Sequence, residues 1–274
     1  MRFMILRKVT EATEATEASS HAASEVAAMS TAMARYGDEL QAAGLRCAGQ
    51  MLHSSEGALR LHFHNGDISA SEGPFPGEKQ LVAGFTMLEA TSEQQALEWL
   101  QRWPAGNEYL TLEMRGCGCP GGLECINLTQ DAADAHQQHL KRFLILLKAS
   151  PLAETGAIPS EAVLAAMAKR NEEGTQSGLL VAGEGLQTTA SGKRIKFTSG
   201  KAAVLDGPFS ETKELIAGYW LLQAKSIADA VDWVRSYPYP FIEDAMVEIR
   251  QVQENAALTA AFLPGIAQTE SLAT

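Results

Sequence analysis

Positive charge is scarce in this chain. Its 22 Lys and Arg residues stand against 33 Asp and Glu residues, so the formal net charge is −11 over 274 residues. A nucleic-acid partner requires a basic surface that meets the phosphates, and we therefore expect none. The deficit is uneven, because residues 1–140 carry 9 basic and 18 acidic side chains whereas residues 141–274 carry 13 and 15. The second half is the more favourable place for an anionic ligand.

Long apolar runs and cysteines are also few. No stretch approaches the roughly 20 apolar residues of a membrane span, and the first eight residues become charged too soon for a signal peptide. Four cysteines suit a reducing compartment. We therefore expect a cytoplasmic protein without a membrane partner. The hydrophobic fraction of 46% is sufficient for ordinary globular cores.

The chain does contain an internal repeat. Glu-Gly-Pro-Phe at 72–75 and Asp-Gly-Pro-Phe at 206–209 are each followed by a Lys, a Leu and an Ala-Gly-aromatic run. Gly73 and Gly207 are 134 positions apart (207 − 73), and the later matches keep the same spacing. A constant shift indicates duplication, so the fold of the chain depends on the fold of one half.

Each half shows the order β-α-β-hairpin-β-α-β. Asn65-Gly66 and Ser199-Gly200 are the hairpin turns, and Ser92 is a helix cap. This order predicts an α+β fold of ferredoxin-like repeats, whose sheets have one face left to bury. We expect the two repeats to pack sheet to sheet as a dimeric α+β barrel within one chain, with a cleft between them. The predicted parts are a first repeat over 1–115, a linker over 116–140, a second repeat over 141–252 and a tail over 253–274.

Several motifs of the second half resemble the YCII-related family, in its DGPF branch. They are the strand 142–148, the Gly-Leu-Leu-Val-Ala-Gly-Glu-Gly-Leu run at 178–186, the Asp-Gly-Pro-Phe loop, the run 213–219 and Glu-Ile-Arg-Gln at 248–251. The first half resembles it more loosely. The resemblance implies the same barrel of ferredoxin-like units. It also implies enzymatic activity in members that pair a helix histidine with the loop aspartate, some of which act on ring compounds. A further implication is an association with alternative sigma factors.

Both halves depart from that pattern. Counting back from the second strand places Met167 at the family's histidine, and Met33 is its equivalent in the first half. A thioether neither carries a proton nor orients a carboxylate. Any acid–base chemistry would rest on a carboxylate alone.

Asp206 is the candidate catalytic carboxylate, either as a base or as a polar contact for a ligand. A structural alternative is an Asx turn that closes its own loop. Glu72 takes its place in the first repeat. Glu184, flanked by glycines on a strand, is a candidate ligand contact, whereas its equivalent, Gln50, has no charge.

Cations near the hairpins form a candidate site for an anionic small molecule. Its members are Arg194, Lys196, Lys213 and Arg60. Solvated surface cations are the alternative interpretation.

We expect no metal and no cofactor. His62 and His64 lie two apart on one strand face, with His53 across the hairpin, but the spacing shows no third ligand. Cys117, Cys119 and Cys125 are three thiols without zinc-site spacing. The Thr-Glu-Ala repeat over 10–18 has no apolar stripe, so we expect a solvated loop or a helical extension.

Three functions remain open. The first is a module that binds a small anionic or ring-containing molecule between the repeats. The second is an enzyme acting on a small organic acid or ring compound through Asp206 without a histidine, of the lyase, isomerase or dehydrochlorinase type. The third is an accessory protein of a sigma-factor circuit, as the resemblance implies. The protein is expected to be a monomeric pseudo-dimer or a homodimer.

Overall fold

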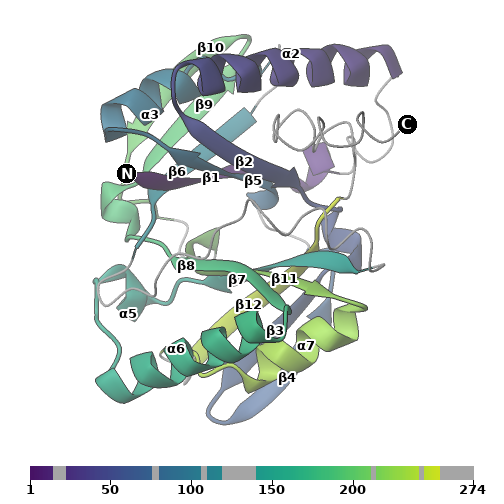
Figure 1. Cartoon of the computed structure of the whole chain (residues 1–274), viewed down its shortest axis with the longest axis vertical. Helices are drawn as coiled ribbons and strands as arrows, with labels where there is room; N and C mark the ends of the chain where they lie inside the picture. The colour runs from purple at the N-terminus through teal and green to yellow at the C-terminus, as the bar shows by residue number, and fades with distance from the viewer. Residues whose placement is uncertain are drawn as a thin grey trace.

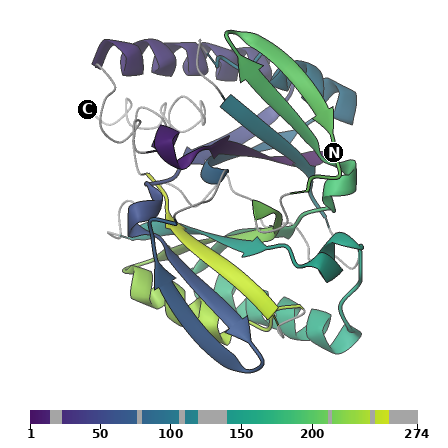
Figure 2. The same cartoon turned by 180° about the vertical axis from the view of Figure 1, so that it is seen from behind.

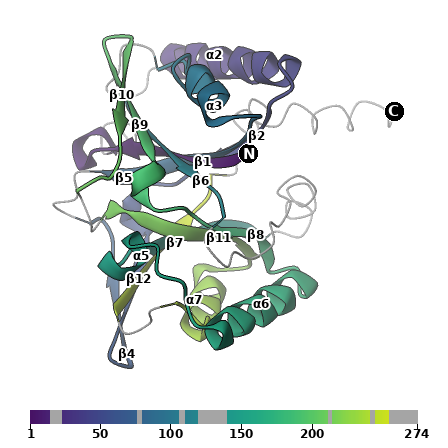
Figure 3. The ribbon, with the colours of Figure 1, turned by 90° about the vertical axis from the view of Figure 1, so that its left-hand side faces the viewer.

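A computed structural model describes residues 1–14, 23–75, 80–105, 110–118, 140–210, 214–240 and 244–253. Two six-stranded antiparallel sheets lie face to face, with helices on the outer face of each (Figure 3). This arrangement confirms the predicted α+β fold of two ferredoxin-like repeats. No helix among the described residues is long and apolar enough to cross a membrane.

The first repeat follows the predicted order of elements. Its members are β1 (Arg2–Val9), α2 (Ala23–Ala42), β2 (Arg46–Met51), the hairpin β3 (Leu59–His64) and β4 (Asp67–Glu72), β5 (Leu81–Glu89), α3 (Glu93–Leu100) and β6 (Leu110–Gly116).

The second repeat has the same order. Its members are β7 (Lys141–Lys148), the short α5 (Pro151–Glu154), α6 (Glu161–Gln176), β8 (Leu180–Gly185), the hairpin β9 (Lys193–Thr198) and β10 (Lys201–Asp206), β11 (Ile216–Ala224), α7 (Ile227–Ser236) and β12 (Asp244–Gln251).

Local signals account for several boundaries. Asn65 and Ser199 have a φ of 50° and are followed by glycines of positive φ, as a two-residue type I′ hairpin turn requires. Ser92 accepts a hydrogen bond from the Gln95 amide at the start of α3. Ser226 and Asp229 form a capping box at the start of α7.

The two repeats exchange their hairpins. The first sheet has the order β10-β9-β6-β1-β5-β2 and the second β4-β3-β12-β7-β11-β8. In Figure 1 the green β9–β10 hairpin of the second repeat therefore lies in the layer of β1 and β6. Figure 2 shows the reverse, with the blue hairpin of the first repeat beside the yellow β12. The order of elements within each repeat does not predict this exchange.

Apolar side chains on the exchanged hairpins explain the exchange. Ile195 and Phe197 on β9 pack into the core beneath α2 and α3, which belong to the first repeat. Leu61 and Phe63 on β3 pack into the core beneath α6 and α7. Each hairpin thus buries its apolar face in the other repeat, and neither repeat has a complete outer core of its own.

A third core fills the space between the sheets. Met4 and Leu6 of β1 meet Leu144 and Leu146 of β7 there. Phe85 and Tyr219, equivalent residues of the two repeats, have ring centroids 6.4 Å apart. These repeated aromatics therefore pack in the core between the sheets.

Candidate ligand cavity and buried ionic clusters

The repeated Gly-Pro-Phe loops fasten the exchanged hairpins. A Cβ atom on Gly207 would lie 1.7 Å from the Thr189 carbonyl oxygen, and one on Gly73 would lie 1.7 Å from that of Ser55. Only glycine allows such an approach. Three positions after the motif's acidic residue, the ring of Phe209 lies 4.0 Å from the Arg194 guanidinium carbon. The glycine and phenylalanine of the motif therefore have structural roles.

Asp206 is the exposed member of the motif. It ends β10 at the edge of the first sheet, and 76% of its side chain is exposed. Its carboxylate is 2.9 Å from Lys193 Nζ, which also contacts Glu93 at 3.3 Å. Asp206 does not line either of the two cavities described below. Its catalytic role stays a prediction, as does any ligand contact of Glu72, which is exposed at the end of β4.

A buried ionic cluster ties the exchanged hairpin to the first sheet. Glu113 on β6 accepts a hydrogen bond from Arg194 Nε on β9 at 2.9 Å. Arg115 Nη1 is 3.2 Å, and Lys8 Nζ 3.5 Å, from the same carboxylate. All four side chains are at most 5% exposed. Glu154 of α5 adds a second carboxylate, 3.6 Å from Arg115.

The second sheet contains the same cluster. Glu248 on β12 accepts from Arg60 Nη2 on β3 at 2.6 Å. Arg250 Nη1 and Lys148 Nζ are each 3.1 Å from this carboxylate. Glu14, 2.9 Å from Arg250, takes the place of Glu154.

Strong fields act on these groups. Burial disfavours the ionised Glu248, but the positive charges of Lys148, Arg250 and Arg60 outweigh burial and hold its pKa well below the usual range. The pKa of Glu113 is lowered in the same way, against burial, by Lys8, Arg115 and Arg194. Burial lowers the pKa of Lys8; Glu113 raises it in part, while Lys148 and Arg194 lower it further. Because the charge of Lys148 acts on Lys8, the two clusters are neighbours between the sheets.

These contacts show where the members of the predicted cation site lie. Arg60 and Arg194 lie in different sheets, each held by a buried glutamate, so the structure does not bring them together. Lys196 is exposed on β9, and Lys213 lies outside the described residues. The anion site stays a prediction. The Thr-Glu-Ala insert was expected to be a solvated loop or a helical extension, and its described residues 11–14 are helical. Glu14 is not solvated, since its side chain is 11% exposed and bound to Arg250 and Ser55. Residues 15–18 lie outside the described part.

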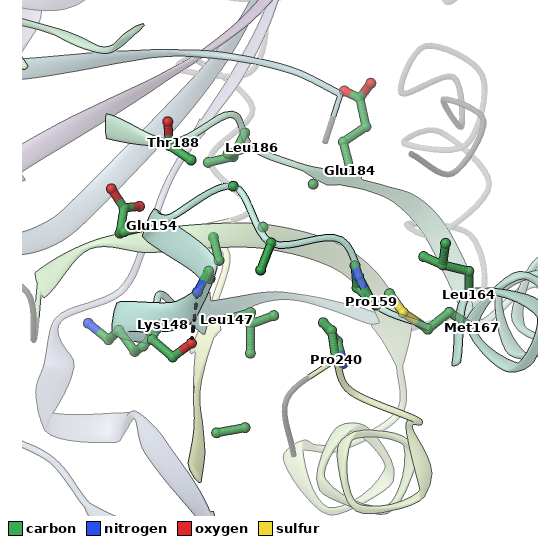
Figure 4. A pocket seen from close by; sticks show the side chains of 18 of the residues that line it. Leu147, Lys148, Glu154, Pro159, Leu164, Met167, Glu184, Leu186, Thr188 and Pro240 are labelled. Carbon is green, nitrogen blue, oxygen red and sulfur yellow. Dashed lines mark hydrogen bonds between the residues drawn. The ribbon is translucent and has the colours of Figure 1, made fainter. Parts of the chain in front are cut away.

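Glu184 joins the two sheets. Its carboxylate is 3.0 Å from Arg2 Nη1 of β1, and the Tyr219 hydroxyl is 3.5 Å away. In Figure 4 this carboxylate points away from Met167 and Pro159, which also line the cavity. Glu184 therefore contributes to the wall of the cavity while its charge serves the sheet interface.

The cavity has a volume of about 110 Å³ and lies between the α5–α6 segment, α6 and the second sheet. All its lining residues fall between Leu147 and Ala245, within the second repeat rather than between the repeats. Most of its surface is apolar, and Leu164, Met167 and Trp220 form part of it. The titratable side chains among the lining residues include Lys148 and Glu154, which belong to the two ionic clusters.

At the equivalent site of the first repeat, the described residues line a cavity of only about 10 Å³. Met51 stands where the second repeat has Gly185, as the registers Met51–Gly84 and Gly185–Gly218 show. The Met51 sulfur would lie 3.0 Å from a Cβ atom on Gly84, so this side chain covers the glycine. Arg7 replaces Leu147 and Thr86 replaces Trp220 in the lining.

Histidines and cysteines are placed as follows. His62 and His64 lie beside Asp244 of β12, whereas His53 is not part of this group. Cys117 is half-buried and forms an isolated β-bridge with Leu186. Cys119 and Cys125 lie outside the described residues.

The buried clusters are the feature that sequence reasoning missed. A signal was available, because Glu-X-Arg occurs inside an apolar strand in both halves, at 113–115 and 248–250. Lys8 and Lys148 likewise close equivalent first strands. A charge within an apolar strand needs a partner, but the partner arginines are on hairpins whose exchange the pattern does not reveal.

The fold and these paired clusters define a tandem α+β protein made of two ferredoxin-like repeats. The model of the YCII-related domain matches the chain twice, over residues 1–114 and 141–255, and the chain belongs to the YCII-related family. It is also similar to "Uncharacterized protein R00369" of Rhizobium meliloti (strain 1021), with 36% identity over 50 residues. That match covers 18% of this chain and 40% of the relative, so the chain spans less than half of the relative's length.

Proposed function

We propose that this protein, of the DGPF type within its family, binds a small ring-containing molecule in the cavity of the second repeat. The observation that carries the proposal is the difference between the cavities lined by described residues, about 110 Å³ in the second repeat and about 10 Å³ in the first. Concave apolar sites with a few polar groups at the margin are the usual form of a small-molecule site.

Size and lining restrict the ligand. An apolar cavity of about 150 Å³ is known to accommodate benzene, so the smaller cavity here, of about 110 Å³, suits nothing larger than a single small ring. Trp220 and Met167 offer an aromatic face and a polarisable thioether to such a ring. Lys148 is committed to Glu248 at 3.1 Å, so a strongly anionic ligand would have to compete with a buried carboxylate. A neutral or weakly polar ring is therefore favoured over an organic acid.

Binding without acid–base chemistry is favoured by Met167. This residue stands where the family resemblance places a histidine, is 7% exposed and lines the cavity. A thioether cannot transfer a proton. Turnover of a ring compound through Asp206, and a role beside a sigma factor, remain hypotheses without a supporting contact among the described residues.

Gly185→Met tests the proposal, because it introduces the side chain that fills the first-repeat site. Ligand-observed NMR and calorimetry with phenol, toluene and benzoate would be run on both proteins. We expect saturable binding of at least one neutral ring by the wild type and a loss of at least about tenfold in affinity in the variant.

Circular dichroism and the melting temperature show whether the variant keeps its fold. Gly57→Met is the matched control, since it makes the same exchange outside the cavity at a glycine where an added Cβ atom would meet no atom within 4 Å. Binding that survives Gly185→Met in a folded protein would place the ligand elsewhere. The absence of binding by the wild type would contradict the proposal.

A further inference from the structure

Two histidines and an aspartate meet at the exposed end of the second sheet. His62 Nε2 is 2.8 Å from Asp244 Oδ1, and His64 Nδ1 is 3.6 Å from the same oxygen. One potential ligand atom from each of the three residues lies within 4.8 Å of the other two. The imidazole rings have centroids 5.9 Å apart.

The exchanged hairpin brings these side chains together. His62 and His64 are two residues apart on β3, so they share one face of the sheet. Asp244 opens β12 and lies directly opposite His64 in the register. Since β3 belongs to the first repeat and β12 to the second, no spacing within one repeat could reveal the third side chain.

We propose that His62, His64 and Asp244 bind a divalent transition-metal ion of the zinc, nickel or copper type. Two imidazoles and a carboxylate are a common ligand set for these ions. Ligand atoms about 2.0–2.2 Å from a tetrahedral zinc ion lie about 3.3 Å from one another. The two distances to Asp244 lie on either side of that value, so small side-chain rotations suffice.

Neighbouring groups support this arrangement. The Asn65 side-chain nitrogen is 2.9 Å from His64 Nε2, on the far side of the ring from Asp244. With its amide turned, the Asn65 Oδ1 atom accepts a hydrogen bond from the Nε2–H group of His64, which leaves the Nδ1 lone pair for the metal. Asp67 of β4 lies opposite His64 in the register, so a second carboxylate is on the same face.

The second repeat offers an internal comparison. Lys196 and Thr198 stand on β9 at the positions of His62 and His64. A lysine and a threonine do not form such a site. Binding of one ion per chain at this place is therefore expected. Asp244 also lines the cavity, whereas the two histidines do not, so the histidine variants distinguish loss of the metal from loss of a cavity ligand.

Calorimetric titration of tag-free protein with zinc chloride tests the site. We compare the wild type, His62→Gln/His64→Gln and His53→Gln, an exposed histidine outside the group. The double variant should lose one equivalent of bound zinc, whereas His53→Gln should retain it. Asp244→Asn should weaken binding by at least about tenfold.

The melting temperature distinguishes zinc binding at this site from zinc binding by the cysteines. Because the ion would connect β3 of one repeat to β12 of the other, zinc should raise the melting temperature of the wild type and of His53→Gln but not that of the double variant. The side chains of His62 and His64 are 42% and 61% exposed, so we expect the double variant to keep its fold, and circular dichroism checks this. An unchanged zinc stoichiometry and thermal shift in the double variant would overturn the proposal.

Discussion

The two repeats share a buried ionic framework and differ in what they enclose. Glu113 and Glu248 have the same set of partners, one lysine and two arginines, with an arginine from the exchanged hairpin in each case. Within the described part of the chain, the cavity beside this framework is about 110 Å³ in the second repeat and about 10 Å³ in the first. The difference separates the residues that hold the architecture from those that could select a ligand.

The buried ionic framework explains why the Gly-Pro-Phe loop occurs in both repeats although the acidic residue before it is exposed. Phe75 lies 3.6 Å from the Arg60 guanidinium carbon and Phe209 takes the same place over Arg194. Each ring shields an arginine whose charge is committed to a buried glutamate, which strengthens the pair by excluding water. The loop is therefore a cover for the ionic cluster in both repeats.

The largest loss of stability should come from removing a carboxylate of this ionic framework. Glu248→Gln leaves three buried cations without their carboxylate, and loss of one member of a buried ion pair costs about 3–5 kcal/mol. Glu113→Gln should cost somewhat less, since Glu214 also favours the charged Lys8, whereas the equivalent position in the first repeat is the neutral Gln80. Urea denaturation measures both free energies of unfolding.

The control for this pair is Glu39→Gln, which removes an exposed contact with Arg102 and should cost less than about 1 kcal/mol. The pH dependence provides a further check. Both buried glutamates have a lowered pKa in the folded state, so their contribution is present above the unfolded value, near 4.5, and is lost as the pH falls below it. Equal stability of wild type and Glu248→Gln at pH 7 would contradict the framework.

An intermediate loss of stability is expected from a substitution that enlarges the small cavity of the first repeat. Met51→Gly removes the side chain that covers Gly84 and reproduces the Gly185–Gly218 pair of the second repeat. We expect a loss of about 1–3 kcal/mol from the half-buried thioether, together with a weak second site for the ring compound that binds the wild type. Calorimetry would show the additional stoichiometry. If Met51→Gly binds no more than the wild type, then Arg7 and Trp103 also keep this site closed.

The sequence was sufficient to predict the strands and helices, but it did not reveal which strands pair or which side chains meet. Alternation and turn residues predicted every strand of the two sheets, because Asn65-Gly66 and Ser199-Gly200 are strong local signals. The exchange of hairpins depends on contacts between residues more than a hundred positions apart, such as Arg194 with Glu113. For the same reason Arg60 and Arg194 resembled surface cations and Asp244 could not be connected with His64.

The smallest effect on stability should come from Asp206, the candidate catalytic carboxylate of the sequence. Asp206→Asn removes an exposed contact with Lys193, whose pKa is raised mainly by that hydrogen bond, and should change the free energy of unfolding by less than about 0.5 kcal/mol. Affinity for a ring compound in the cavity should also be unchanged, because Asp206 does not line it. Glu72→Gln, at the equivalent position of the first repeat, is the matched control. A large loss of binding or turnover in Asp206→Asn alone would restore the aspartate as a functional group and would make the edge of the first sheet, rather than the cavity, the place where the repeats differ in chemistry.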